Sequence, residues 1–153
     1  MAPLSSRPTA GSRRRIAALL WLSFIVGLLP AAWAQKVVAP ASIAGSRLVT
    51  AHEATELIAS TPALRVFDCR LAEEYAKGHI EGSLNVTDGD LTTAVLARYA
   101  PDKTMPLLFY CNGPGCLRSA RAVGKAVGWG YRTVYWFRGG MEEWLERRLP
   151  LMR

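Results

Sequence analysis

The sequence is poor in residues that bind metals, with two histidines and three cysteines among 153 residues. His52 and His79 stand apart from each other, and the pair Cys111 and Cys116 has no matching His/Cys pair elsewhere. Structural zinc sites are built from two such pairs at short spacing. We therefore expect no metal site in this protein.

The sequence also lacks internal repeats, low-complexity tracts and a basic stripe. The formal charge is +7, but four of the 19 Lys and Arg residues lie within the first 15 positions. The 15 that remain face 12 acidic residues, and no run of Lys and Arg with interleaved aromatic residues is left. We therefore expect no binding to nucleic acid.

No apolar run reaches the roughly 20 residues that a membrane-spanning helix needs. The longest, residues 16–29, has 14 residues; it follows Arg13-Arg14-Arg15 and precedes Ala32-Trp33-Ala34. A basic segment, an apolar segment and an A-x-A site are the parts of a secretory signal peptide. We predict that residues 1–34 are a signal peptide and that the protein is exported, to a periplasm. If the segment is not cleaved, it is the only part of the chain expected to contact a membrane.

The chain beyond this segment has the pattern of an α/β domain. Residues 35–45 are expected to be a linker, and residues 46–153 are long enough to form one domain. Strands are expected at residues 47–50, 64–68, 83–86, 106–110 and 133–137. Helices are expected at residues 50–60, 71–77, 90–99, 118–127 and 141–148. Strict alternation predicts a central, mainly parallel sheet of about five strands with helices on both faces, and a site at the carboxyl ends of the strands.

One cysteine stands where such a site is expected. Cys111 directly follows the most apolar strand, and a loop rich in Gly and Pro separates it from Arg118, which opens a predicted helix. Gly113 and Gly115 permit positive φ angles, so successive backbone N–H groups can point inward. Loop amides, the helix N-terminus and an arginine favour negative charge and lower the pKa of a thiol. We therefore predict that Cys111 is a nucleophile that acts on an anionic group.

A second segment, which begins at Asp68, is expected to be mainly structural. Asp68 ends a predicted strand and can cap the helix that follows. Arg70 and Glu74 are four residues apart and can form an ion pair. His79 is expected to make a fixed hydrogen bond rather than to act as a base. In a third segment, Gly139-Gly140 lets the last helix pack closely after its strand.

Together, the three segments resemble the rhodanese-like domain family over about residues 46–148. Three motifs occur in the family's order. They are Asp68-x-Arg70…Glu74-Tyr75…Gly78-His79-Ile80-x-Gly82-Ser83-x-Asn85, Tyr110-Cys111…Arg118-Ser119 and Val134…Gly139-Gly140…Trp144. The resemblance implies a rhodanese-like domain at residues 46–153 and sulfurtransferase activity. Cys111 would take sulfane sulfur from a small sulfur-containing anion or a persulfide, and pass it to an acceptor such as a protein thiol. No metal or organic cofactor is implied.

The resemblance also assigns residues to roles. Cys111 and Arg118 are the catalytic residues that it implies. The residues that it implies for substrate binding are Asn112, Gly113, Pro114, Gly115, Cys116, Leu117, Asp68 and Arg70. The first six form the loop that would cradle the persulfide and the anionic donor, and the last two match the family's pair near the sheet end.

The loop is longer than the family's usual one. Six residues separate Cys111 from Arg118, whereas the family usually has four and related phosphatases have five. The Cys-Asn-Gly-Pro-Gly-Cys loop resembles that of exported, single-domain or redox-associated members, and it makes a wider cradle. A phosphatase is less favoured, since no acid is suitably placed in sequence to protonate a leaving group.

Cys116 leaves two interpretations open. It is either a small apolar residue that faces the core, or a second thiol that forms a disulfide with Cys111 or attacks its persulfide. A link between Cys69 and Cys111 is a third, less favoured option. The alternatives to a sulfurtransferase are accordingly a thiol–disulfide redox or sulfur-relay partner that uses Cys111 and Cys116, and a non-catalytic binding module.

Overall fold

The computed structural model describes residues 38–153. The predicted signal peptide and the first three residues of the predicted linker lie outside this part. The five strands are β1 (Arg47–Leu48), β2 (Arg65–Asp68), β3 (Leu84–Asn85), β4 (Leu107–Tyr110) and β5 (Val134–Phe137). The helices are α1 (Ala51–Ser60), α2 (Ala72–Lys77), α3 (Thr93–Tyr99), α4 (Leu117–Gly128) and α5 (Gly140–Glu146). None of these helices is long and apolar enough to cross a membrane.

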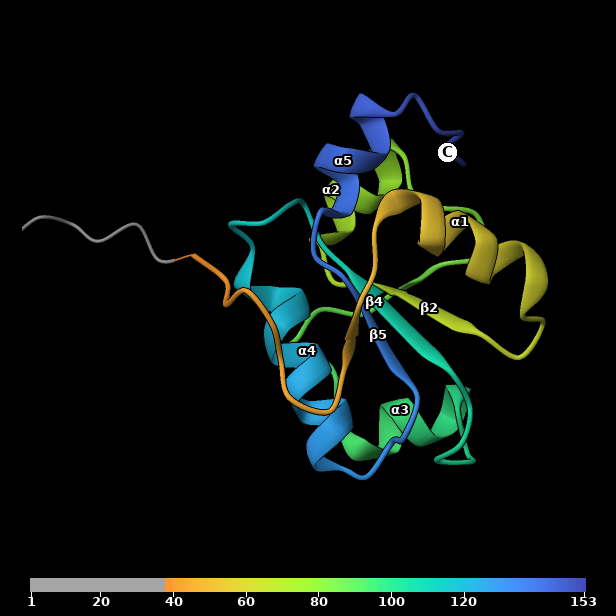
Figure 1. Ribbon diagram of the computed structural model, residues 1–153, viewed down its shortest axis with the longest axis vertical. Coiled ribbons are helices and arrows are strands. Elements are labelled where there is room, and N and C mark those ends of the chain that lie inside the picture. Colours follow the sequence, from red (N-terminus) through yellow and green to blue (C-terminus); the bar gives the residue numbers. More distant parts are fainter. Residues whose placement is uncertain (1–37) are drawn as a thin grey trace, which may run out of the picture. The chain divides into compact units, whose positions relative to one another are not determined.

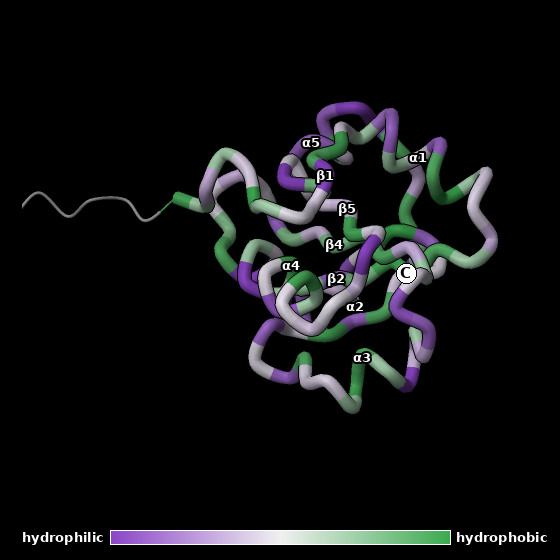
Figure 2. The backbone as a smooth tube through the Cα atoms, turned by 60° about the horizontal axis from the view of Figure 1, so that its bottom comes forward, coloured by the Kyte–Doolittle hydropathy of each residue, from purple (hydrophilic) through white to green (hydrophobic). Residues whose placement is uncertain are grey.

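The strands form one sheet in the order β1-β5-β4-β2-β3, and every pair in it is parallel. Helices cover both faces: α1 and α5 lie on one side, and α3 and α4 lie on the other (Figure 1 and Figure 2). The predicted fold class is thus confirmed. The central strand β4 is buried along its whole length, as its continuous apolar sequence requires between two helical layers.

Two apolar clusters fill the space on either side of the sheet. One packs α3 and α4 against Phe67, Phe109 and Trp136. The other packs α1 and α5 against Leu108 and Phe137. Alternate residues of each central strand therefore point to opposite clusters, which fixes the register of the sheet.

The element bounds differ from the predicted ones by at most three residues. The largest difference is at α3, which was predicted to begin at Asp90 but begins at Thr93. The hydroxyl of Thr92 caps this helix by accepting from the backbone N–H of Val95. Asp90 instead accepts from the hydroxyl of Thr87 in the preceding turn. At α1, Thr50 and Glu53 form a reciprocal capping box.

Three segments meet at the carboxyl end of the sheet. The loop after β4, the helix α2 and the start of α5 lie at this end of the molecule (Figure 1). Hydrogen bonds join the loop to both helices, through Asn112 to Glu74 and through Asn112 to Glu142. This is the edge where sites form in parallel sheets.

Candidate functional site

The loop that starts at Cys111 is held from below by the first turn of α5. The carbonyl of Cys111 accepts from the backbone N–H of Met141 at 2.9 Å, and that of Asn112 accepts from Glu142 at 2.7 Å. Gly140 permits this approach: its φ is +55°, and a Cβ atom there would clash with the carbonyl oxygen of Cys111. The predicted close packing after Gly139-Gly140 is therefore confirmed, with the loop as the packing partner.

Cys111 and Cys116 form a disulfide, with their Cα atoms 6.2 Å apart. This agrees with the interpretation of Cys116 as a second thiol that forms a disulfide with Cys111. Cys111 is almost completely buried, at 1% exposure, whereas Cys116 is half-buried. Cys69 is free and buried, so the alternative Cys69–Cys111 link is absent. Burial, with the nearby charge of Asp68, raises the pKa of the Cys69 thiol, which therefore keeps its proton.

The disulfide places the sulfur of Cys111 at the N-terminus of α4. Cys116 is the N-cap residue of this twelve-residue helix, and no side chain caps the first amides. Such an end carries partial positive charge and free N–H groups. The sulfur of Cys111 is bonded to that of Cys116, so it lies at this positive end.

An open pocket of about 510 Å³ adjoins the same helix end. It is lined by Asn112, Gly113, Gly115, Cys116, Leu117, Arg118, Arg121 and Glu142. Five of the six predicted cradle residues are in this set, and Pro114 is not. Arg118 and Arg121 contribute two positive charges and Glu142 one negative charge. The pocket thus offers a small anion two cationic side chains and a helix N-terminus.

The glycines of the loop act differently from the prediction. Neither Gly113 nor Gly115 has a positive φ. A Cβ atom on Gly113 would meet the carboxylate of Glu142, whose flexible side chain would have to move, whereas a Cβ atom on Gly115 would meet nothing within 4 Å. The side of the loop at Gly113 therefore packs against α5, and the side at Gly115 is open.

Arg118 is held by a carboxylate from another element. Its guanidinium donates to Glu74 Oε2 at 3.2 Å, and its Nε is buried without an acceptor among residues 38–153. Glu74 Oε1 accepts from the amide of Asn112 at 2.7 Å. Burial alone would raise the pKa of Glu74, but hydrogen bonds from Leu71 and Asn112 and the charge of Arg118 lower it. Glu74 is therefore an ionised brace between α2 and the loop.

The predicted ion pair between Arg70 and Glu74 is wrong. Arg70 instead pairs with Asp68, its Nη2 lying 2.6 Å from Asp68 Oδ2. Asp68 does not cap α2 as predicted. It accepts from the backbone N–H of Arg70, while Glu74 accepts from Leu71 at the start of α2.

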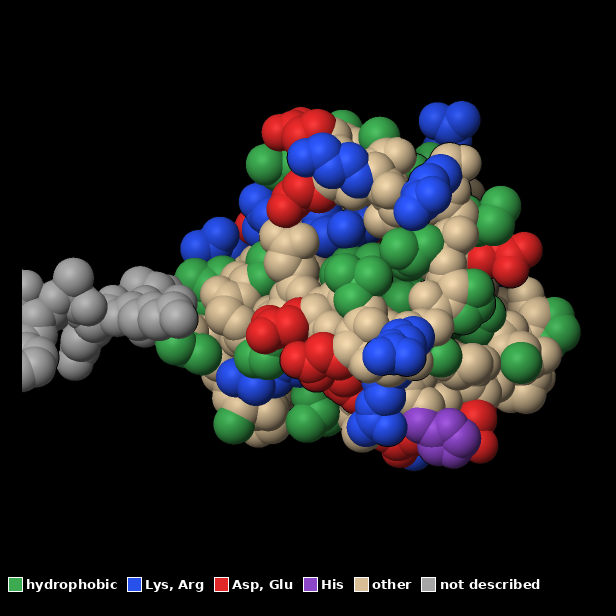
Figure 3. All heavy atoms as spheres, turned by 90° about the horizontal axis from the view of Figure 1, so that it is seen from above, with side chains coloured by type: hydrophobic (Ala, Val, Ile, Leu, Met, Phe, Trp, Pro, Cys, Tyr) green, Lys and Arg blue, Asp and Glu red, His purple; other side chains and the backbone are tan. Residues whose placement is uncertain are grey.

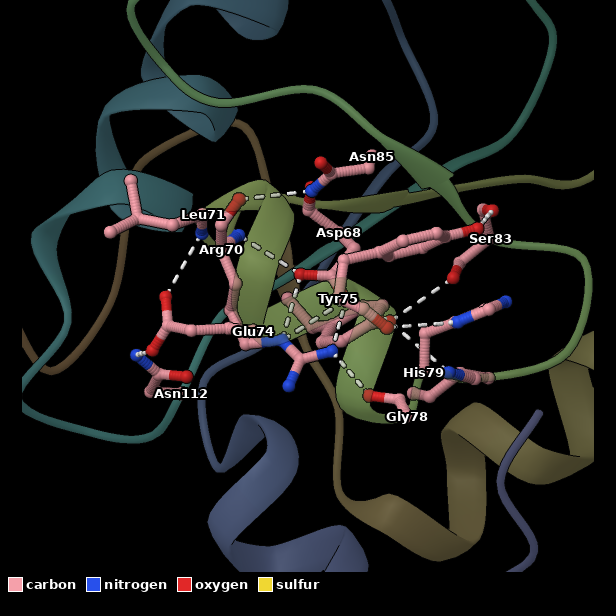
Figure 4. A network of polar contacts seen from close by, with 12 residues as sticks. Asp68, Arg70, Leu71, Glu74, Tyr75, Gly78, His79, Ser83, Asn85 and Asn112 are labelled. Carbon is pink, nitrogen blue, oxygen red and sulfur yellow. Dashed lines mark hydrogen bonds and ion pairs between the residues drawn. The ribbon is translucent and has the colours of Figure 1, made fainter. Parts of the chain in front are cut away.

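Asp68 and Arg70 belong to a buried network beneath the site (Figure 4). Arg70 also donates to the carbonyl of Gly78, and Tyr110 donates its hydroxyl to Asp68 Oδ2 at 2.6 Å. Burial and the charge of Asp68 raise the pKa of Tyr110, so the phenol remains a donor. Neither Asp68 nor Arg70 lines the pocket. Their geometry is that of residues that fix the ends of β2 and β4, and their direct contact with a substrate stays a prediction.

The predicted hydrogen bond of His79 is confirmed. Its Nδ1 lies 3.1 Å from the carbonyl of Tyr75, and its ring stacks on that of Tyr75 at 3.8 Å between centroids.

Seen from the end of the molecule that carries α2 and α5, acidic and basic side chains are interspersed over the surface (Figure 3). In the pocket, Arg118 pairs with Glu74 at 3.2 Å and Arg121 pairs with Asp88 at 3.3 Å, so the positive charge of both arginines is partly neutralised.

The family model described as "Rhodanese-like domain" matches residues 50–147. The chain belongs to the rhodanese-like domain family. Among curated relatives of this rhodanese-like protein, the human "Thiosulfate:glutathione sulfurtransferase" is 33% identical over 116 residues, covering 69% of this chain and 98% of the relative.

A second relative has no described activity. "Uncharacterized protein YibN" of Escherichia coli (strain K12) is 27% identical over 142 residues, and the match covers 92% of each protein. Because this share exceeds the described residues, the match includes part of the N-terminal segment. Among solved structures, the BH2092 protein from Bacillus halodurans superposes with a TM-score of 0.62 at 22% identity, covering 69% of this chain and 76% of that one. This last likeness concerns the fold.

Three residues of this rhodanese-like site were missed by the sequence analysis. Arg121 lies three residues after Arg118 on α4, so helical spacing could have placed it on the same side. Glu142 and Glu74 come from other elements, and no local pattern connects them with the loop. The described residues contain no cluster of three His, Cys, Asp or Glu side chains that could hold a metal ion.

Proposed function

We propose that this rhodanese-like protein is a sulfurtransferase that carries sulfane sulfur as a persulfide on Cys111. The observation that carries the proposal is the position of the Cys111 sulfur, which lies at the uncapped positive end of α4 beside a pocket with two arginines. Such a setting stabilises a thiolate and binds the anionic group of a sulfur donor. The human relative, named for transfer between thiosulfate and glutathione, supports the same class of reaction.

The reaction begins once the disulfide has been reduced. The Cys111 thiolate attacks the outer sulfur of thiosulfate, the sulfur–sulfur bond of the donor breaks, and sulfite leaves with the electron pair. Cys111 then carries a persulfide, and an acceptor thiol takes its outer sulfur in a second displacement. The two half-reactions are covalent catalysis by an activated nucleophile. Arg118 and the first amides of α4 hold the charge of the donor and of the departing sulfite.

Intact mass measurement of the reduced Cys116→Ser variant, which cannot form the disulfide, after incubation with thiosulfate tests the proposal. The expected result is a gain of one sulfur atom, which is lost in Cys111→Ser. Arg118→Gln should lower the rate of persulfide formation about tenfold or more, because it removes a charged hydrogen-bond donor. Arg98→Gln, an exposed arginine on α3, is the matched control. If no sulfur is added by thiosulfate or by a range of persulfide donors, the proposal is wrong.

The disulfide favours a second candidate function, thiol–disulfide exchange with a partner protein. In that case, Cys111 and Cys116 carry electrons instead of sulfur. A Cys116→Ser variant separates the two functions, since it can still accept sulfur on Cys111 but cannot cycle through a disulfide. If the wild-type protein accepts no sulfur from any donor but efficiently oxidises a dithiol partner, the result favours the second function.

We also propose that the protein is exported and that its acceptor is a protein thiol in the same compartment. The apolar segment, the A-x-A site and the cysteine pair support this location. N-terminal sequencing of the protein purified from its own compartment tests it. A mature N-terminus at Gln35 is expected, and an intact Met1 would show that the segment is retained.

A further inference from the structure

We propose that Cys116 is a resolving thiol that converts the Cys111 persulfide into the observed disulfide and releases sulfide. The inference rests on the proposed persulfide on Cys111. In this step, the Cys116 thiolate attacks the inner sulfur, which is the Sγ atom of Cys111. The bond from Sγ to the outer sulfur breaks, and the outer sulfur leaves with the electron pair as HS⁻. The protein would then be a reductase of sulfane sulfur as well as a carrier of it.

The backbone of the loop directs this attack to the inner sulfur. The two Cα atoms are 6.2 Å apart, within the range that lets two cysteine sulfurs bond directly. The loop is held from both sides, by α5 through Cys111 and Asn112 and by α2 through Glu74. The Cys116 sulfur is therefore kept at bonding distance from Sγ. Attack on the outer sulfur would merely move the persulfide to Cys116, and it would need a displaced loop.

Of the thiols in the described part of the chain, only Cys116 can take this role. Cys69 is fully buried at the end of β2, and its own backbone N–H donates to the carbonyl of Tyr110. Its burial also keeps it protonated. Cys116 lies at the N-terminus of α4, where the helix end stabilises its thiolate. The leaving HS⁻ would enter the pocket beside Arg118, which favours an anion.

The exposure of the two cysteine residues also indicates how the disulfide is reduced again. In the disulfide state Cys111 is almost completely buried and Cys116 is half-buried, so a dithiol from outside attacks Cys116. Cys111 then leaves as a thiolate at the positive helix end, ready for the next donor, and the second thiol of the dithiol frees Cys116. Over one cycle, thiosulfate and a dithiol give sulfite, hydrogen sulfide and the oxidised dithiol. The reducing partner is therefore of the protein-dithiol class.

A single-turnover experiment on the full mature chain tests the inference. The protein is reduced, freed of reductant and mixed with thiosulfate without any added thiol, and sulfite, sulfide and protein mass are measured. The expected ratio of sulfide to sulfite is near unity, with the protein ending as the disulfide. In Cys116→Ser the ratio should fall to background, and a persulfide should persist. Cys69→Ala is the control, and its ratio should match that of the wild-type protein.

The outcomes separate this inference from the function on which it rests. Sulfite release with a lasting persulfide and no sulfide from the wild-type protein would overturn the resolving role and leave the sulfurtransferase intact. A normal ratio in Cys116→Ala would do the same. No sulfite from either protein would instead overturn the sulfurtransferase itself.

Discussion

At Gly140, a residue without a side chain sets the height of the loop above α5. Its φ of +55° lies in the left-handed region, and the space where a Cβ atom would stand is occupied by the carbonyl of Cys111. Two hydrogen bonds from the next residues, Met141 and Glu142, then fix the first two carbonyls of the loop. The position of Cys111 thus depends on a glycine 29 positions away in the sequence.

Gly140→Ala should destabilise the protein and disturb the site together. The backbone conformation alone costs a residue with a side chain about 1–3 kcal/mol, and the clash adds to this. Urea denaturation and the rate of persulfide formation measure the two effects. Gly115→Ala is the matched control in the same loop, since its Cβ atom would meet nothing. Equal stability of Gly140→Ala and the wild-type protein would contradict this account.

On the scale of elements, the short helix α2 acts as a brace for the loop. Glu74 joins its own N-terminus at Leu71 to Asn112 in the loop and to Arg118 on α4. One carboxylate therefore connects α2 with the loop and with the start of α4, through partners 38 and 44 positions later in the sequence. The brace depends on the negative charge of Glu74, and so it depends on pH.

Glu74→Gln should weaken this brace above acidic pH and have little effect below it. The pKa of Glu74 is lowered in the folded protein from an ordinary value of 4.5. A carboxylate with a lowered pKa contributes stability above the unfolded value, and this contribution is lost as the pH falls through the folded value. The difference in unfolding free energy between wild type and variant should therefore shrink as the pH falls below about 4.5. Glu73→Gln, which removes an exposed carboxylate from the same helix, is the matched control.

How far the elements could be predicted depends on whether their determinants are local. The alternation of strand patterns and helix patterns predicted every strand and helix, because each element depends on its own local sequence. The start of α3 was misplaced since both Asp90 and Thr92 can cap a helix. The predicted pair of Arg70 and Glu74 was wrong because Arg70 lies before α2, which begins at Ala72, and pairs locally with Asp68. Helical spacing also says nothing of Arg118, the partner of Glu74 from α4. The position of Cys111 at the end of β4 could be predicted from the strand and the loop. Glu142 comes from an element that no local pattern connects with the loop.

On the scale of the whole molecule, two apolar clusters stabilise the fold and the disulfide adds little to them. Cys111 and Cys116 are five positions apart at the edge of the sheet, and both clusters are built from the helices and the strands. A cross-link over so short a loop restricts the unfolded chain only slightly. Reduction is therefore compatible with a folded, active protein.

Reduction should lower the free energy of unfolding by about 2 kcal/mol or less and leave the fold intact. Urea denaturation with and without a dithiol reductant measures the difference, and circular dichroism reports the fold. Cys111→Ser, which cannot form the disulfide, should match the reduced protein. Unfolding on reduction in the absence of urea would show that the disulfide supports the core.

The pairing of β1 with β5 has a consequence for the order of assembly. Arg47 lies opposite Tyr135, so the first strand finds its partner only when nearly the whole domain is present. Such distant pairing closes late, because a long segment of chain must be ordered first. Both cysteines of the loop precede β5 in the chain, and their contact spans only a short segment. Oxidation of the loop can thus precede completion of the sheet during synthesis, and under the proposed function a newly made molecule must be reduced before it can accept sulfur.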